Sequence, residues 1–174
     1  MILPKIRDPR LVTIRRGGTL TDEDHRHLGR WAAQCAERVL PLFEDAHPED
    51  ARPREAIAAV RSWTHGDMAM MESRARGGHA MGAARPLRGA ARFAAFSAGQ
   101  AACVAHVAEH DLGAAAYAIK AVQAAAPPGH EEAARVAERD WQRDHLPVEV
   151  RDLVLENQER RNAICWSVFD DIRS

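Results

Sequence analysis

His106, Glu109 and His110 match the pattern H-x-x-E-H of the inverted zinc proteases. On a continuous helix, histidines four residues apart share a face and can bind one zinc ion, with the glutamate as base. A third ligand would have to come from elsewhere, and Glu131 and Glu132 are the nearest downstream carboxylates. Because nothing around those two residues marks them as ligands, neutral histidines hydrogen-bonded at a helix end are the favoured interpretation. We therefore predict no catalytic, cofactor-binding or metal-binding residue, and a metal-dependent hydrolase stays as an alternative function.

A second candidate segment surrounds His79, which follows Gly77-Gly78. Each glycine inside a helix costs roughly 1 kcal/mol relative to alanine, so we expect a break or a mobile segment there. Methionines are adaptable and can line a groove, although they more often fill a core. Those near this segment are Met68, Met70, Met71 and Met81. A helical bundle that binds a small apolar ligand near His79 is therefore a second alternative function.

Residues 1–20 form a basic arm with a composition of its own. Pro4 and Pro9 oppose helix, and residues 11–14 favour a strand before the turn signal of Gly17-Gly18. We expect an extended arm or a short hairpin packed across the rest of the protein. Its charged residues are Lys5, Arg7, Asp8, Arg10, Arg15 and Arg16. The alternative interpretation of this basic arm is a docking surface for an acidic partner.

His25 and His27 stand beside the acids of Asp22-Glu23-Asp24. Such a cluster can bind a cation, but Thr21 followed by acids is also the usual beginning of a helix, because the acids suit the helix dipole. Solvated helix capping is the favoured interpretation.

The elements that must position these residues are helices. Apolar spacing and breaker residues predict about seven of them. The first helix should begin at Thr21 and bend at Pro41, and the second should run from about Pro53 to His65, before Gly66. The other five are expected to begin near Asp67, at Pro86, near Gly113, after Gly129 and near Pro147. The sixth should bury Ala133, Ala134, Ala137 and Trp141, and residues 147–172 form one helix or two.

The alanine-rich stretch from Pro86 to Pro128 should form two closely packed helices at the centre. We expect the first of them to reach about Asp111, with Gly113 as a cap or a tight joint into the second. The predicted fold is all-α: one domain over residues 1–174, made of the arm (1–20) and a helical bundle (21–174).

Charge and cysteine content bound the function further. The 24 basic and 25 acidic residues give a formal net charge of −1, so neither nucleic acid nor a membrane is the expected partner. Cys35, Cys103 and Cys165 are odd in number and far apart, which favours a reducing cytoplasm over a disulfide framework. The sequence also shows no signal peptide and no segment that would span a bilayer.

Several phrases along the chain occur together: LPKIRDPRLVTIRRGGTLTDEDH, WAAQCAERVLPLFE, PREAIAAVRSW, LGAAAYAIKAV, and WQRDHLPVEVRDLV running to RRNAICW. They resemble the bacterial Imm-5-like putative immunity proteins, a helical family associated with polymorphic toxin systems. The most specific pieces are Met1–Asp24, Leu112–Val122, and Trp141, Gln142, Leu146 and Pro147. The resemblance implies an all-helical, non-enzymatic protein that binds and neutralises a cognate toxin, and it assigns no catalytic residue.

Overall fold

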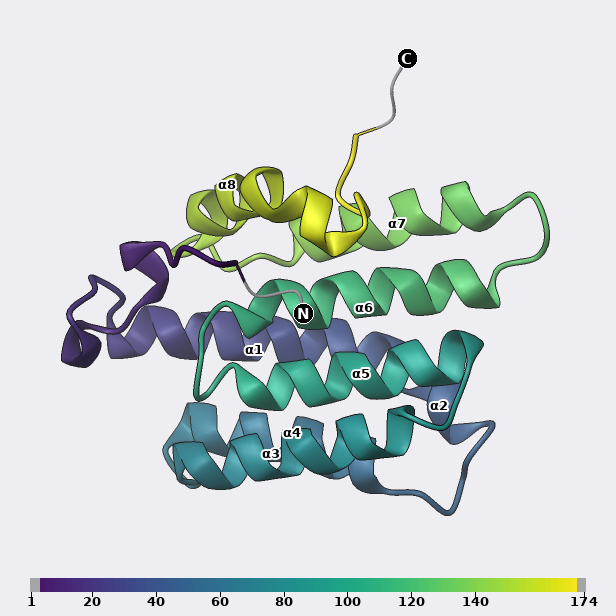
Figure 1. The fold of residues 1–174 in the computed structure, drawn as a ribbon, viewed down its shortest axis with the longest axis horizontal. Helices are drawn as coiled ribbons and strands as arrows, with labels where there is room; N and C mark the ends of the chain where they lie inside the picture. Colours follow the sequence, from purple (N-terminus) through teal and green to yellow (C-terminus); the bar gives the residue numbers. More distant parts are fainter. Residues whose placement is uncertain (1–3, 172–174) are drawn as a thin grey trace.

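The computed structural model describes residues 4–171, and every regular element within that range is helical (Figure 1). The α-helices are α1 (Asp22–Val39), α2 (Pro41–Glu44), α3 (Arg52–His65), α4 (Met70–Ala84), α5 (Gly89–Cys103), α6 (His110–Ala125), α7 (Glu131–Asp144) and α8 (Arg151–Arg161). Three 3-10 helices accompany them: η1 (Pro9–Leu11), η2 (Ile14–Arg16) and η3 (Asn162–Cys165). The predicted all-α fold is confirmed. None of the helices in the described range combines the length and the apolar character needed to cross a membrane.

Helices α5 and α6 form the centre of the bundle. Helix α4 packs on α5 and α3 packs on α4, while α7 packs on α6 and α1 contacts both central helices (Figure 1). Alanine presents only a methyl group, so neighbouring helix axes can approach closely. The fully buried alanines of this pair include Ala94, Ala95, Ala98, Ala101, Ala102, Ala114, Ala115, Ala116, Ala118 and Ala121. The predicted alanine-rich central pair is therefore confirmed.

Local signals set several helix ends as predicted. The Thr21 hydroxyl accepts a hydrogen bond from the Asp24 amide at 3.0 Å and caps α1. Pro41 does more than bend that helix, because α1 ends at Val39 and Pro41 begins α2. Helix α3 ends where Gly66 takes a φ of 87°, a left-handed conformation that glycine adopts without steric cost.

The first central helix is shorter than predicted. Helix α5 ends at Cys103, residues 104–109 form a turn, and Gly113 lies buried inside α6 instead of joining two helices. No glycine or proline marks this turn. Contacts from other helices occupy the last carbonyls: His25 Nε2 donates to the Val104 carbonyl at 2.7 Å, and Ser73 donates to the Ala102 carbonyl at 2.9 Å. These tertiary hydrogen bonds replace the missing helical ones.

The break predicted at Gly77-Gly78 is wrong, because α4 is continuous from Met70 to Ala84. Gly77 is buried against α5, where a Cβ atom would lie 2.6 Å from the Gly99 carbonyl oxygen. Gly78 is exposed, with open space around the position of a Cβ. Gly77 therefore allows close contact between α4 and α5 and does not break the helix.

In its described part, residues 4–20, the arm forms 3-10 turns instead of strands. A single β-bridge joins Thr13 to Leu20, and both Leu11 and Leu20 are buried, so the arm packs across the bundle as expected. Asp8 accepts a hydrogen bond from Arg10 within the arm at 3.0 Å. It accepts another from Arg160 of α8 at 2.5 Å, which links the arm to that helix.

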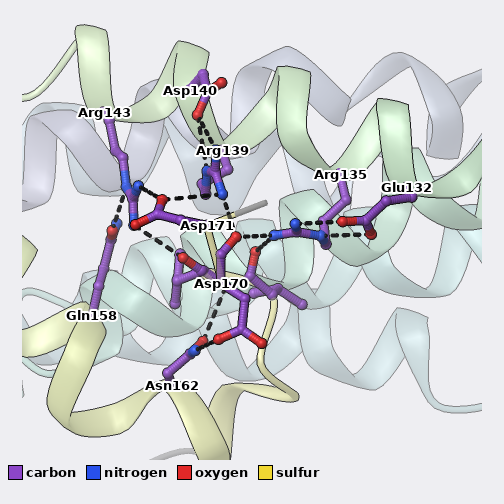
Figure 2. A network of polar contacts seen from close by, with 11 residues as sticks. Glu132, Arg135, Arg139, Asp140, Arg143, Gln158, Asn162, Asp170 and Asp171 are labelled. Carbon is purple, nitrogen blue, oxygen red and sulfur yellow. Dashed lines mark hydrogen bonds and ion pairs between the residues drawn. The ribbon is translucent and has the colours of Figure 1, made fainter. Parts of the chain in front are cut away.

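The inner face predicted for α7 is wrong. Ala133 and Ala137 are exposed, and the buried residues of the helix are Arg135, Glu138, Arg139 and Gln142. Figure 2 shows the reason: guanidinium groups along α7 hold the backbone of the C-terminal segment. Arg135 donates to the carbonyls of Val168 and Asp170 at 2.7 and 2.8 Å. The Arg135 and Arg139 side chains are buried, and each of their guanidinium nitrogens donates a hydrogen bond, so a polar face can serve as an inner face.

The C-terminal region forms two segments instead of one long helix. Helix α8 ends at Arg161, η3 follows, and Trp166 and Ser167 then adopt left-handed φ values of 58° and 56°. The parts of the predicted ranges at residues 1–3 and 172–174 lie outside the described residues.

Candidate functional site: an arginine-lined cleft

The structure separates the residues of the H-x-x-E-H pattern. His106 lies in the turn between α5 and α6, whereas His110 is the first residue of α6. Glu109 is 1% exposed and accepts hydrogen bonds from both Nε and Nη2 of Arg7, at 2.7 and 2.6 Å. Nδ1 of His110 lies 2.7 Å from Oε1 of Gln100. The shared helical face on which the hydrolase alternative depends is therefore not formed.

The site suggested around His79 is not formed either. His79 is exposed on the unbroken helix α4, so the break expected beside it is absent. Met71 on the same helix is 51% exposed. Met68 and Met70 instead line a cleft at the other end of α4.

This cleft, of about 370 Å³, opens where the arm, the beginning of α1 and two interhelical turns meet. Its lining includes Arg7, Leu11, Thr13, Arg15 and Arg16 from the arm, Asp22, His25 and Arg26 from α1, and Trp63, Met68, Met70, Ala105 and His106 near the two turns. We call it the arginine cleft. The structure thus brings together the basic arm, one histidine of the α1 cluster and one histidine of the H-x-x-E-H pattern.

Most of the positive charge in the arginine cleft is paired. Arg7 binds Glu109, Arg15 lies 2.8 Å from Asp22, and Arg26 lies 3.6 Å from Glu23. Arg16 differs: it is exposed, and its guanidinium makes no hydrogen bond or ion pair within residues 4–171. Among residues 4–171, the charge of Arg16 therefore faces the cleft without an ion-pair partner.

Burial favours the neutral form of both histidines of the cleft. Burial lowers the pKa of His25, whose Nε2 donates to the Val104 carbonyl and whose ring meets Trp63 edge to face at 4.8 Å. Burial, followed by the nearby charges of Arg16, Arg74 and Arg7, also lowers the pKa of His106. The Nδ1 atom of His106 is buried and has no hydrogen-bond partner among the described residues.

The other residues singled out in the sequence lie elsewhere. Arg10 binds Asp8 and Glu156, and His27 lies 3.6 Å from Glu23. Sequence reasoning missed Trp63 and Arg26 as residues of the cleft. The position of Trp63 just before the helix-ending Gly66 was the available signal, since residues at helix ends border turns where clefts form.

The arrangement is suited to holding an anion beside an apolar group. Guanidinium groups bind carboxylates through charge-assisted hydrogen bonds, and Trp63 and the methionines supply apolar surface. Such a combination of cations and aromatic surface is typical of residues that carry the binding energy of protein interfaces.

Comparison with known proteins gives the chain its family. Neither a curated protein nor a solved structure matches it. The sequence model of the Imm-5 like putative immunity proteins matches residues 18–149, which covers the bundle from the end of the arm to the beginning of α8. The cleft residues from Asp22 to His106 fall inside this range, whereas Arg7, Arg15 and Arg16 precede it. The match extends over well more than half of the sequence, and the chain therefore belongs to the Imm-5-like putative immunity protein family.

Proposed function

We propose that this protein is an immunity protein that neutralises a cognate toxin by direct binding, without catalysis. Membership in the Imm-5-like family is the observation that carries the proposal. The arginine cleft supports it, because its groups are arranged to hold a partner. The His25 imidazole is engaged by the Val104 carbonyl, and the Glu109 carboxylate by Arg7. The Glu109 carboxylate is therefore held as the ion-pair partner of Arg7 and is not free to act as a general base.

A preformed surface is a second support. Leu11 and Leu20 anchor the arm in the core, and Asp8 ties it to α8, so the wall of the cleft is ordered before a partner arrives. Binding to an ordered surface loses less conformational entropy than binding that must first fold a segment.

In this proposal the protein acts in the cytoplasm of a bacterium that produces the toxin. The three cysteines are buried and unpaired, and burial raises the pKa of both Cys103 and Cys165 to about 11. Thiols in that state suit a reducing compartment.

The test is co-expression with the toxin domain encoded by the neighbouring gene. We expect cell growth to be restored, a stable complex of defined stoichiometry on size-exclusion chromatography, and toxin of unchanged intact mass after the complex is denatured. Toxin activity should fall in proportion to the amount of protein added, because a binder acts stoichiometrically.

Two results would contradict the proposal. Growth that is not restored removes the immunity role. Inactivation of a molar excess of toxin, or a change in its mass, would show that the protein acts as an enzyme.

A further inference from the structure

The arginine cleft concentrates positive charge in a chain that is nearly neutral overall. The formal net charge is −1. Four arginines line this cleft, and three of them are paired with Glu109, Asp22 and Glu23, which leaves the charge of Arg16. Arg74 of α4 lies close enough to influence His106 and adds to the same positive region. Clustered like charges raise the local concentration of oppositely charged partners. The cleft therefore favours an anionic ligand.

One group in the cleft lacks a partner that a ligand can supply. The Arg16 guanidinium makes no hydrogen bond or ion pair within the described residues. Arg16 influences both His25 and His106, which places it near the two rings. A carboxylate that pairs with Arg16 would therefore also lie beside the His106 ring, which lines the same cleft.

Part of the remaining lining is apolar. Leu11, Trp63, Met68 and Met70 contribute to it, and Trp63 and both methionines are only partly buried. A small hydrated anion would leave this surface unused. A charged group attached to a large apolar neighbour uses both parts of the cleft.

We infer that the arginine cleft binds an acidic side chain of the toxin together with an adjacent large apolar side chain. This inference rests on the proposed function. The carboxylate lies against Arg16 and His106, and the apolar side chain lies against Trp63 and the two methionines. A carboxylate suits the site better than a phosphate dianion, because the other three lining arginines already face carboxylates and one guanidinium is left.

The first experiment uses blocked peptides and the full-length protein labelled with ¹³C at the methionine methyl groups. The probe is Ac-Phe-Glu-Leu-NH₂, with Ac-Phe-Gln-Leu-NH₂ as its neutral control and inorganic phosphate as a separate titrant. We expect the glutamate peptide to shift the Met68 and Met70 signals at millimolar concentration, with the Met81 signal unchanged. Arg16→Gln should weaken this binding about tenfold. The matched control is Arg88→Gln, which removes an exposed charge at the beginning of α5 and should leave binding unchanged.

Three results overturn the inference. The Met68 and Met70 signals do not move with the glutamate peptide, or they move equally with both peptides, or phosphate binds more tightly than the peptide. Because the exposed Arg16 side chain makes no hydrogen bond or ion pair within the described structure, the variant is expected to remain folded, and its circular dichroism verifies this.

The second experiment separates this inference from the proposed function. Protection against the neighbouring toxin is compared for the natural protein, Arg16→Gln and Arg88→Gln. Protection by the natural protein and Arg88→Gln, with loss in Arg16→Gln, supports the inference. Equal protection by all three leaves the immunity role in place and overturns the cleft as its binding site. Failure of the natural protein to protect contradicts the proposed function, while the peptide titration still decides what the cleft binds.

Discussion

Replacing the two adjacent glycines of α4 one at a time should change stability in opposite directions. At Gly77 a Cβ atom would lie 2.6 Å from the Gly99 carbonyl oxygen, 2.8 Å from the Cys103 sulfur and 3.2 Å from the Ala102 Cβ. At Gly78 nothing lies within 4 Å of the corresponding position. Gly77→Ala and Gly78→Ala therefore make the same chemical change on the same helix, one against α5 and one in solvent.

The magnitudes follow from two opposing effects. Alanine is favoured over glycine inside a helix by roughly 0.5–1 kcal/mol. Gly78→Ala should gain this amount in full. Gly77→Ala gains it too, but overpacking a well-packed core costs about 1–3 kcal/mol. The upper part of that range applies because the nearest obstacle, the Gly99 carbonyl, belongs to the backbone of α5 and cannot rotate away. We expect a net loss of about 1–2 kcal/mol for Gly77→Ala, and a difference of about 2 kcal/mol between the variants.

Urea denaturation followed by far-UV circular dichroism measures both free energies of unfolding. In a thermal scan each 1 kcal/mol corresponds to about 2–4 °C in Tm for a chain of this size. The reasoning is refuted if Gly77→Ala is as stable as Gly78→Ala, because α4 and α5 would then not be in close contact at this point.

Two further predictions concern a buried histidine and the C-terminal segment. Burial lowers the pKa of His110 to about 4, and the unfolded chain has a value near 6.5, so stability should be complete above about pH 6.5 and decline as the pH falls to about 4. Urea midpoints across this range should show a shallower decline for His110→Asn, and an unchanged slope would assign the effect to other groups. Arg135→Met removes the hydrogen bonds to the carbonyls of Val168 and Asp170, so limited proteolysis should cut that segment faster while circular dichroism stays the same. Equal cleavage rates would show that these bonds do not hold the segment in place.

Helix ends with a strong local signal were predictable from the sequence. Thr21, Pro41 and Gly66 act through their own side chains or backbone freedom, and the structure places a helix boundary at each of them. Boundaries made by distant contacts were not predictable. The turn after α5 depends on His25 and Ser73, which reach it from α1 and α4.

The inner face of α7 shows a second limit of sequence reasoning. Apolar patterning selected Ala133 and Ala137, but the helix buries Arg135 and Arg139 because carbonyl groups of a segment about 30 residues later accept their hydrogen bonds. Hydropathy describes the cost of burying a guanidinium and contains no information about such partners.

The residue types of the candidate site were predictable from the sequence, but its position in the fold was not. The basic arm was recognised as a possible docking surface for an acidic partner, and His25 and His106 were both noted. Their convergence with Trp63 on one cleft joins segments that are far apart in the sequence. Only the packing of α1, α3 and the α5–α6 turn brings them together.

Glu109 lies between the arm and the last helix. Its carboxylate holds Arg7, while its backbone carbonyl accepts a hydrogen bond from Arg161 of α8 at 2.9 Å. Asp8 makes a parallel link from the arm to Arg160. A ligand that displaces Arg7 from Glu109 would therefore weaken the contacts that hold α8 in place. Amide hydrogen exchange in α8 would then report occupancy of the arginine cleft, which Arg7 lines.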